Sequence, residues 1–130
     1  MLPSLLVVLA STEQPCVESG SHVSIRYTGS IHSLSAAGTP GNVYDEGTIS
    51  FVVGRGEVIL GMDEGVVGAC VGDTRTLVVP PEKGYGEAGL KSHERGGKWW
   101  EGIPGDATLQ LVVCVRLKLT PTTAVLCAPA

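Results

Sequence analysis

The sequence predicts an α+β domain, with an antiparallel sheet and one short helix. Three segments alternate apolar and polar residues at every second position, which is the pattern of a half-buried strand, and a fourth is read as a strand that stops at Pro80-Pro81. These segments are residues 23–28, 48–53, 74–79 and 108–119, and glycine-rich loops separate them. Helical periodicity occurs in one place, Leu60–Ala69. One helix against one sheet is an α+β arrangement.

Two further segments show a weaker secondary-structure pattern than these strands. Met62, Val66 and Ala69 share one face of the predicted helix, but three glycines in Leu60–Ala69 lower its helix propensity. We therefore expect packing against the sheet to hold the helix in place. The apolar run Leu5–Ala10 is short for a signal peptide and no basic residue precedes it, which favours a β-strand there.

Composition places the chain among compact, turn-rich, single-domain proteins. It has 130 residues, of which 43% are hydrophobic and 17% charged, with 18 glycines and 8 prolines. The net charge of −4 argues against a nucleic-acid partner, which would need a basic stripe. No apolar run approaches the ~20 residues that a membrane span requires. We expect no nucleic-acid partner and no membrane span.

Four cysteines stand at positions 16, 70, 114 and 127, none of them in a closely spaced pair. A zinc site needs such pairs, so we expect no structural metal. The even count fits one or two disulfides, or four buried thiols. Composition alone does not choose between these states.

Five blocks of sequence carry a family resemblance: YTG at 27–29, YD at 44–45, FVVGRGEVILGMDEGV at 51–66, VGDTRTLVVPPEKGYGEAG at 71–89 and IPGDATLQLVV at 103–113. In this order and spacing the chain resembles the FKBP family, peptidyl-prolyl cis-trans isomerases that also bind macrolide immunosuppressants. The resemblance runs from about Ser4 to Leu119, so we assign residues 4–120 to this domain and expect a loosely ordered tail at 121–130. It implies an antiparallel five- to six-stranded sheet curled around one short helix.

The resemblance also implies an apolar pocket, between sheet and helix, that takes a proline ring. By motif, its catalytic positions are Tyr27, Asp45, Ile59 and Tyr85, and its other substrate-binding positions are Tyr44, Ile49, Val58, Met62, Ile103 and Leu111. The backbone N–H of Ile59 and the hydroxyl of Tyr85 match groups that hydrogen-bond substrate or drug carbonyls. The carboxylate of Asp45 matches one that lines the pocket and bonds inhibitor hydroxyls.

Such a pocket needs no nucleophile and no cofactor. Amide resonance sets a rotation barrier of roughly 18–20 kcal/mol, and a twisted peptide bond loses that resonance. The twisted amide is less polar, so an apolar pocket tolerates it better than water does, while fixed donors orient the carbonyls. We accordingly expect proline-containing polypeptides as substrates, no cofactor and a monomeric protein.

Departures from the family pattern leave a second interpretation open. Met62 stands where the family usually has a tryptophan at the floor of the pocket, and Ile49 and Leu111 replace usual phenylalanines. Methionine keeps the site apolar but is flexible. We expect lower isomerase activity and weaker macrolide binding than in a member with a fully aromatic pocket. The alternative is a noncatalytic FKBP-like binding or chaperone module with an eroded pocket.

The loop from residue 90 to 102 is longer than in simple members of the family. It holds both Trp99 and Trp100, and we expect one of them to pack and the other to cover the surface. The competing hypothesis is a loop that contacts a partner or gates the substrate, since tryptophan and arginine are enriched at binding hot spots.

The resemblance also pairs Cys16 with Cys70, which match a disulfide found in secretory-pathway members. We therefore expect the endoplasmic-reticulum lumen or another oxidising compartment, with the cytoplasm as the alternative. Cys114 is expected on the outward face of the last strand. Whether Cys127 pairs with it is left open.

Overall fold

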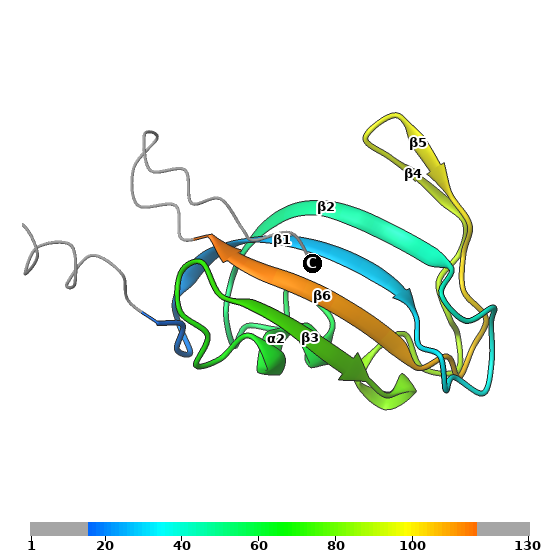
Figure 1. Ribbon diagram of the computed structural model, residues 1–130, viewed down its shortest axis with the longest axis horizontal. Coiled ribbons are helices and arrows are strands. Elements are labelled where there is room, and N and C mark those ends of the chain that lie inside the picture. The colour runs from blue at the N-terminus through cyan, green and yellow to red at the C-terminus, as the bar shows by residue number, and fades with distance from the viewer. Residues whose placement is uncertain (1–15, 117–130) are drawn as a thin grey trace, which may run out of the picture.

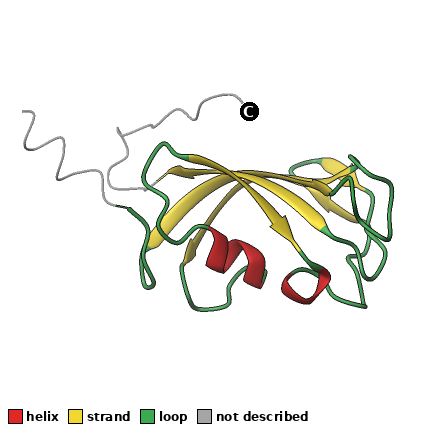
Figure 2. Ribbon diagram, turned by 60° about the horizontal axis from the view of Figure 1, so that its bottom comes forward, coloured by secondary structure: helices red, strands yellow, loops and turns green. Residues whose placement is uncertain are grey.

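The computed structural model describes residues 16–116, which form one curved sheet with a small hairpin beside it (Figure 1). The sheet has the strand order β2-β1-β6-β3, and every neighbouring pair is antiparallel. Its strands are β1 (His22–Ile31), β2 (Val43–Val52), β3 (Thr74–Val79) and β6 (Leu109–Arg116). The hairpin consists of β4 (His93–Arg95) and β5 (Lys98–Trp100). The helix α2 (Leu60–Gly65) and the 3₁₀ turn η1 (Pro81–Lys83) lie on one face of the sheet (Figure 2).

All four predicted strands are present, the last of them as far as Arg116, where the described residues end, and the predicted α+β class is confirmed. The second strand begins earlier than predicted, at Val43, because the polar run that ends at Gly47 hides the alternation. The predicted strand at Leu5–Ala10 and the expected tail at 121–130 lie outside the described residues.

The helix is shorter than predicted, six residues rather than the whole of Leu60–Ala69. It ends because the following backbone pairs with the segment before β1. Gly68 donates its N–H to the carbonyl of Val17, and Val17 donates to the carbonyl of Ala69. Arg75 of β3 adds a cap, since its guanidinium donates to the carbonyls of Gly65 and Val67 at the end of the helix.

The hydrophobic core lies between α2 and the face of the sheet that the helix covers. Alternate residues of β1 and β6 supply nearly half of it, among them the fully buried Ile25, Leu109 and Val113. Met62 and Val66 bring the apolar face of the helix, as the sequence predicts. Because strand side chains alternate between faces, a shift of one residue in register would turn this whole set toward solvent.

Two glycines let the helix approach the sheet closely. A Cβ atom at Gly61 would lie 2.5 Å from Val79 Cγ1, and one at Gly65 would lie 2.6 Å from Leu77 Cδ1. Both distances are shorter than atoms in contact allow. The residues that weaken the helix in isolation therefore permit the packing that stabilises it.

The disulfide implied by the resemblance is present and joins Cys16 to Cys70, 54 residues apart. It ties the segment before β1 to the turn after α2, beside the backbone bonds of Val17. Cys114 lies on the face of β6 away from the core cluster, yet it is only 5% exposed. Cys127 lies outside the described residues. Within residues 16–116 there is no helix with the length and apolarity to cross a membrane.

Substituting Gly61→Ala should destabilise the fold although alanine is the better helix former. The added methyl meets the buried, β-branched Val79, so we expect a loss of about 1–3 kcal/mol in the free energy of unfolding. Denaturant titration measures it. In a Val79→Ala background the same substitution should cost clearly less, because the clashing methyl groups are gone. An equal cost in both backgrounds would contradict the packing argument.

The double substitution Cys16→Ser, Cys70→Ser should lower the free energy of unfolding by about 3–4 kcal/mol, because the unfolded chain regains the entropy of an open loop. Substitution is preferable to a reductant, which would also act on other cysteines. Thermal unfolding of both proteins at equal concentration provides the comparison. An unchanged midpoint would show that the bond adds nothing to stability.

Candidate active site

A cavity of about 400 Å³ opens between the sheet and the N-terminal end of α2. It brings together every residue predicted for the pocket except Ile103, and adds Glu57 and Arg95. Its lining consists of Tyr27, Tyr44, Asp45, Ile49, Glu57, Val58, Ile59, Met62, Tyr85, Arg95 and Leu111. Ile103 is buried in the core, where its backbone bridges to Leu90, and it lines a different cavity.

The strands place the polar residues on one wall. In the antiparallel register Tyr27 of β1 lies opposite Gly47 of β2, and Asp45 is two residues further along β2. Tyr27 and Asp45 are therefore diagonal neighbours on the same face. The ring of Tyr44 packs over Gly29, where a Cβ would lie 2.6 Å from the ring, and its edge meets Tyr85 with the ring centroids 6.0 Å apart.

The loop before the helix is fixed by the buried carboxylate of Asp63. Its Oδ1 accepts a hydrogen bond of 2.7 Å from the backbone N–H of Gly54, and its Oδ2 accepts one of 3.2 Å from Gly56. Both glycines have positive φ, +90° and +70°, which other residues adopt at a cost. The loop so fixed leads directly into Val58 and Ile59 at the rim of the pocket.

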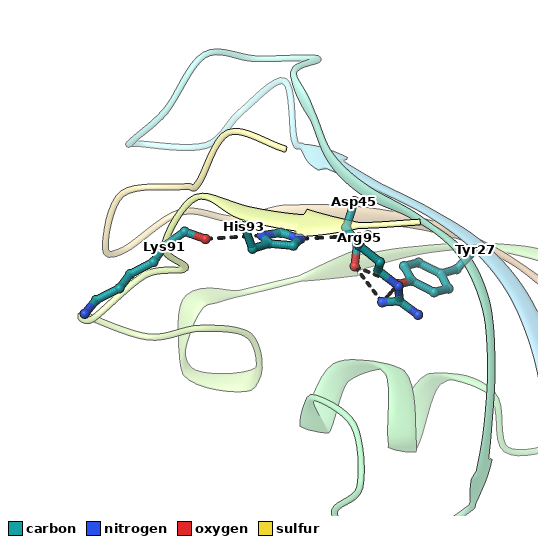
Figure 3. A network of polar contacts seen from close by, with 5 residues as sticks. All are labelled: Tyr27, Asp45, Lys91, His93 and Arg95. Atoms are coloured by element: carbon teal, nitrogen blue, oxygen red, sulfur yellow. Dashed lines mark hydrogen bonds and ion pairs between the residues drawn. The ribbon is translucent and has the colours of Figure 1, made fainter. Parts of the chain in front are cut away.

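A partly buried network of three residues crosses the pocket wall (Figure 3). The hydroxyl of Tyr27 donates to Asp45 Oδ2 at 2.6 Å. Arg95, delivered by the β4–β5 hairpin, donates from Nη1 to the same carboxylate oxygen at 3.0 Å and also to the hydroxyl oxygen of Tyr27. Its guanidinium carbon lies 5.5 Å from the centre of the Tyr27 ring. The hairpin is thereby anchored at the pocket.

The second oxygen of Asp45 has no hydrogen-bond partner among the described residues, although it is buried. His93 Nε2 lies 4.0 Å away, too far for a hydrogen bond, and the other ring nitrogen of His93 faces the carbonyl of Lys91 at 3.2 Å (Figure 3). A buried carboxylate oxygen without a hydrogen-bond donor is costly, so a hydroxyl or amide that reached this atom would relieve the cost.

Two donors at the rim are also unpartnered within residues 16–116. The backbone N–H of Ile59, just before the helix, donates to no described acceptor, and the Tyr85 hydroxyl makes no hydrogen bond there. Together with Asp45 Oδ1, these are three polar groups without a described hydrogen-bond partner, on residues that line the cavity beside the apolar Ile49, Met62 and Leu111. Pockets that fix a ligand's orientation have this composition.

Burial raises the pKa of all three tyrosines in the pocket. For Tyr27 the largest cause is desolvation, followed by its hydrogen bond to Asp45, and Arg95 offsets a part of the rise. Desolvation is also the largest cause of the raised pKa of Tyr44, and neighbouring Tyr85 adds to it. Desolvation likewise raises the pKa of Tyr85, and neighbouring Asp45 adds to that rise. The hydroxyls therefore remain protonated and act as donors at neutral pH.

Arg95 and Glu57 are the lining residues that motif matching missed. Arg95 contacts Asp45 across 50 positions of sequence, and its loop shows no periodicity that would place it. The one available signal was the length and basic character of that loop.

The two tryptophans of the loop differ in burial as predicted, with Trp100 buried and Trp99 65% exposed.

Alkaline titration checks the burial of the pocket. These three tyrosines are the only ones in the chain, and their ordinary pKa is 10.0. The folded protein should show little tyrosinate absorbance at pH 10, whereas the chain in denaturant should be half ionised. Since the unfolded state ionises first, stability should fall as pH rises above 10. Native titration centred at pH 10 would contradict the buried pocket.

Comparisons with known proteins agree with this site. The family described as FKBP-type peptidyl-prolyl cis-trans isomerase matches residues 14–116. FK506-binding protein 2 of Dictyostelium discoideum is 44% identical over 93 residues, which cover 71% of this chain and 61% of that protein. FK506-binding protein 2 of Emericella nidulans is 48% identical over 67 residues, 51% of this chain and 42% of that protein.

Among solved structures, the crystal structure of AtFKBP13 superposes with a TM-score of 0.59 and 28% identity, covering 76% of this chain and 79% of that one. The chain spans less than two thirds of the length of both curated relatives described above. The family match nevertheless takes in all the strands, the helix and the pocket described above. The chain belongs to the family of FKBP-type peptidyl-prolyl cis-trans isomerases.

Proposed function

We propose that this chain accelerates the cis–trans isomerisation of X-Pro peptide bonds in polypeptides. The observation that carries the proposal is the 400 Å³ cavity, which has an apolar floor and a few unpartnered polar groups at its rim. Family membership supplies the reaction class, and the cavity supplies a place for it.

In this proposal the proline ring enters between Ile49, Met62 and Leu111. The backbone N–H of Ile59 and the hydroxyl of Tyr85 donate to substrate carbonyls, and their lack of other partners in the described chain supports that role. The apolar floor favours the twisted amide, which has lost part of its resonance and hence of its polarity. Uncatalysed X-Pro bonds take tens to hundreds of seconds to isomerise, so even a modest stabilisation matters.

Asp45, Tyr27 and Arg95 act as a fixed polar wall in this scheme. Because Arg95 and Tyr27 both donate to Oδ2, the carboxylate is held in one orientation, with Oδ1 4.0 Å from His93 Nε2. Dipoles that are fixed beforehand need no reorganisation when the bond twists. The role of Ile103, which lies outside the cavity lining, is confined to packing beneath the site in this proposal.

One observation favours the alternative of a noncatalytic binding module. Met62 at the pocket floor is a flexible side chain where a rigid indole is usual in the family. A macrolide would also find less aromatic surface here, so we propose weaker binding of such inhibitors.

We further propose that the protein works in the secretory pathway or another oxidising compartment, on proline-containing polypeptides. The Cys16–Cys70 disulfide supports this, because such bonds persist where thiols are not kept reduced.

The first test is a protease-free isomerisation assay on a series of Xaa-Pro peptides, with and without a macrolide inhibitor. We expect macrolide-sensitive catalysis. Met62→Trp should raise kcat/KM and macrolide affinity by about two- to tenfold, since the larger ring buries more apolar ligand surface, worth roughly 0.5–1.5 kcal/mol at about 25 cal/mol per Å².

Met62→Leu is the matched control, because it changes the side chain without adding a ring and should leave both quantities nearly unchanged. Near-ultraviolet circular dichroism verifies that each variant is folded, and Met62→Phe is a smaller substitute if the indole does not fit. A folded wild-type protein without catalysis on any peptide would move the function to binding.

A further inference from the structure

A second cavity, of about 540 Å³, adjoins the proline pocket on the other side of Arg95. It lies between the β4–β5 hairpin and the strands β1 and β2, and it shares Tyr27 and Arg95 with the pocket. These two side chains therefore form a common wall. Because the two cavities share these residues, a polypeptide with its proline in the first is within reach of the second in a few residues, at about 3.3 Å per extended residue.

The Arg95 guanidinium has two nitrogens whose N–H groups make no hydrogen bond to a described residue. Its Nη1 makes the bonds to Asp45 and Tyr27, while Nε and Nη2 have no acceptor among the described residues. Those two nitrogens face Gly47, where a Cβ would lie 3.9 Å from each of them. Gly47 places no side chain beside this edge of the guanidinium, and the Arg95 side chain as a whole is 39% exposed. Two parallel N–H groups on one edge fit a carboxylate bidentately.

The rest of the lining is also rich in donors. Lys98 Nζ lies 4.1 Å from the centre of the Trp100 ring, so an ammonium is held at the cavity by a cation–π contact. The indole N–H of Trp100 is buried, with no acceptor in the described part of the chain. Arg26 adds a third cation, against the single carboxylate of Glu46 in the lining. This local excess of cations contrasts with the net charge of −4 of the whole chain.

We propose that this second cavity is a substrate subsite for an acidic side chain, aspartate or glutamate, close to the isomerised proline. The carboxylate binds the open edge of Arg95, with Lys98 as the second cation. The inference rests on the proposed function and deepens it by naming a preferred class of substrate. The long loop that carries the hairpin then acts as a specificity element.

The test compares short peptides with one proline that differ at a single flanking position, occupied by Glu, Gln or Lys in turn. Scanning that position on both sides of the proline locates the subsite. At the favoured position we expect kcat/KM for the Glu peptide to exceed that for the Lys peptide about tenfold, with Gln between them. The preference should shrink at high salt, because the subsite is partly open to solvent.

Lys98→Met should reduce the preference for Glu over Gln about threefold. Lys91→Met is the matched control: it removes the same charge from the same loop, and the Lys91 side chain points away from the pocket network (Figure 3). It should leave the preference unchanged. Both lysines are exposed, so both variants should fold.

Equilibrium binding of the same peptides, measured by tryptophan fluorescence, distinguishes failure of the subsite proposal from failure of the catalytic proposal. Glu-selective binding that Lys98→Met weakens supports the subsite even if no peptide is isomerised, and in that case the catalytic proposal alone is wrong. Isomerisation or binding without any Glu preference, or a preference that Lys91→Met and Lys98→Met reduce equally, would overturn the subsite.

Discussion

The buried carboxylate of Asp45 is the constraint around which the functional end of the molecule is organised. A charge taken out of water must be paired and hydrogen-bonded, and β2 alone offers nothing for this purpose. Tyr27 supplies a donor from the neighbouring strand, and Arg95 supplies a second donor and the countercharge from the hairpin. One carboxylate thus links β1, β2 and β4. The ion pair between Arg95 and Asp45 therefore holds the hairpin at the pocket.

The opposite wall of the pocket, formed at the N-terminal end of α2, is held in place by close packing. Gly61 and Gly65 bring α2 against β3, and Asp63 ties the loop before the helix to the helix itself. A helix of six residues has little stability of its own, so these contacts determine where its N-terminal end lies. The polar wall is held by electrostatics and the apolar wall by steric fit, and the cavity is the space between them.

Much of this could be predicted from the sequence because its signals are local. The strand around Ile25 and the strand through Val113 both follow the alternation, and the family blocks place Tyr27 and Asp45. Arg95 could not be predicted, since its position depends on a contact 50 residues away and on a hairpin with no periodic pattern. The end of the helix could not be predicted for a similar reason, because the backbone hydrogen bonds that terminate it are made with Val17, which is distant in sequence.

The Cys16–Cys70 bond closes a covalent ring, and the pocket is divided between that ring and the chain beyond it. Tyr27, Asp45 and Met62 lie inside the ring, whereas Tyr85 and Arg95 belong to the open portion. The apolar floor is divided in the same way, because Ile49 and Met62 lie inside the ring and Leu111 lies beyond it. Strand β1 inside the ring pairs with β6 beyond it, so the backbone hydrogen bonds of the sheet join the two parts of the site. The disulfide thus constrains one part of the site, and the pairing of β1 with β6 brings the other part to it.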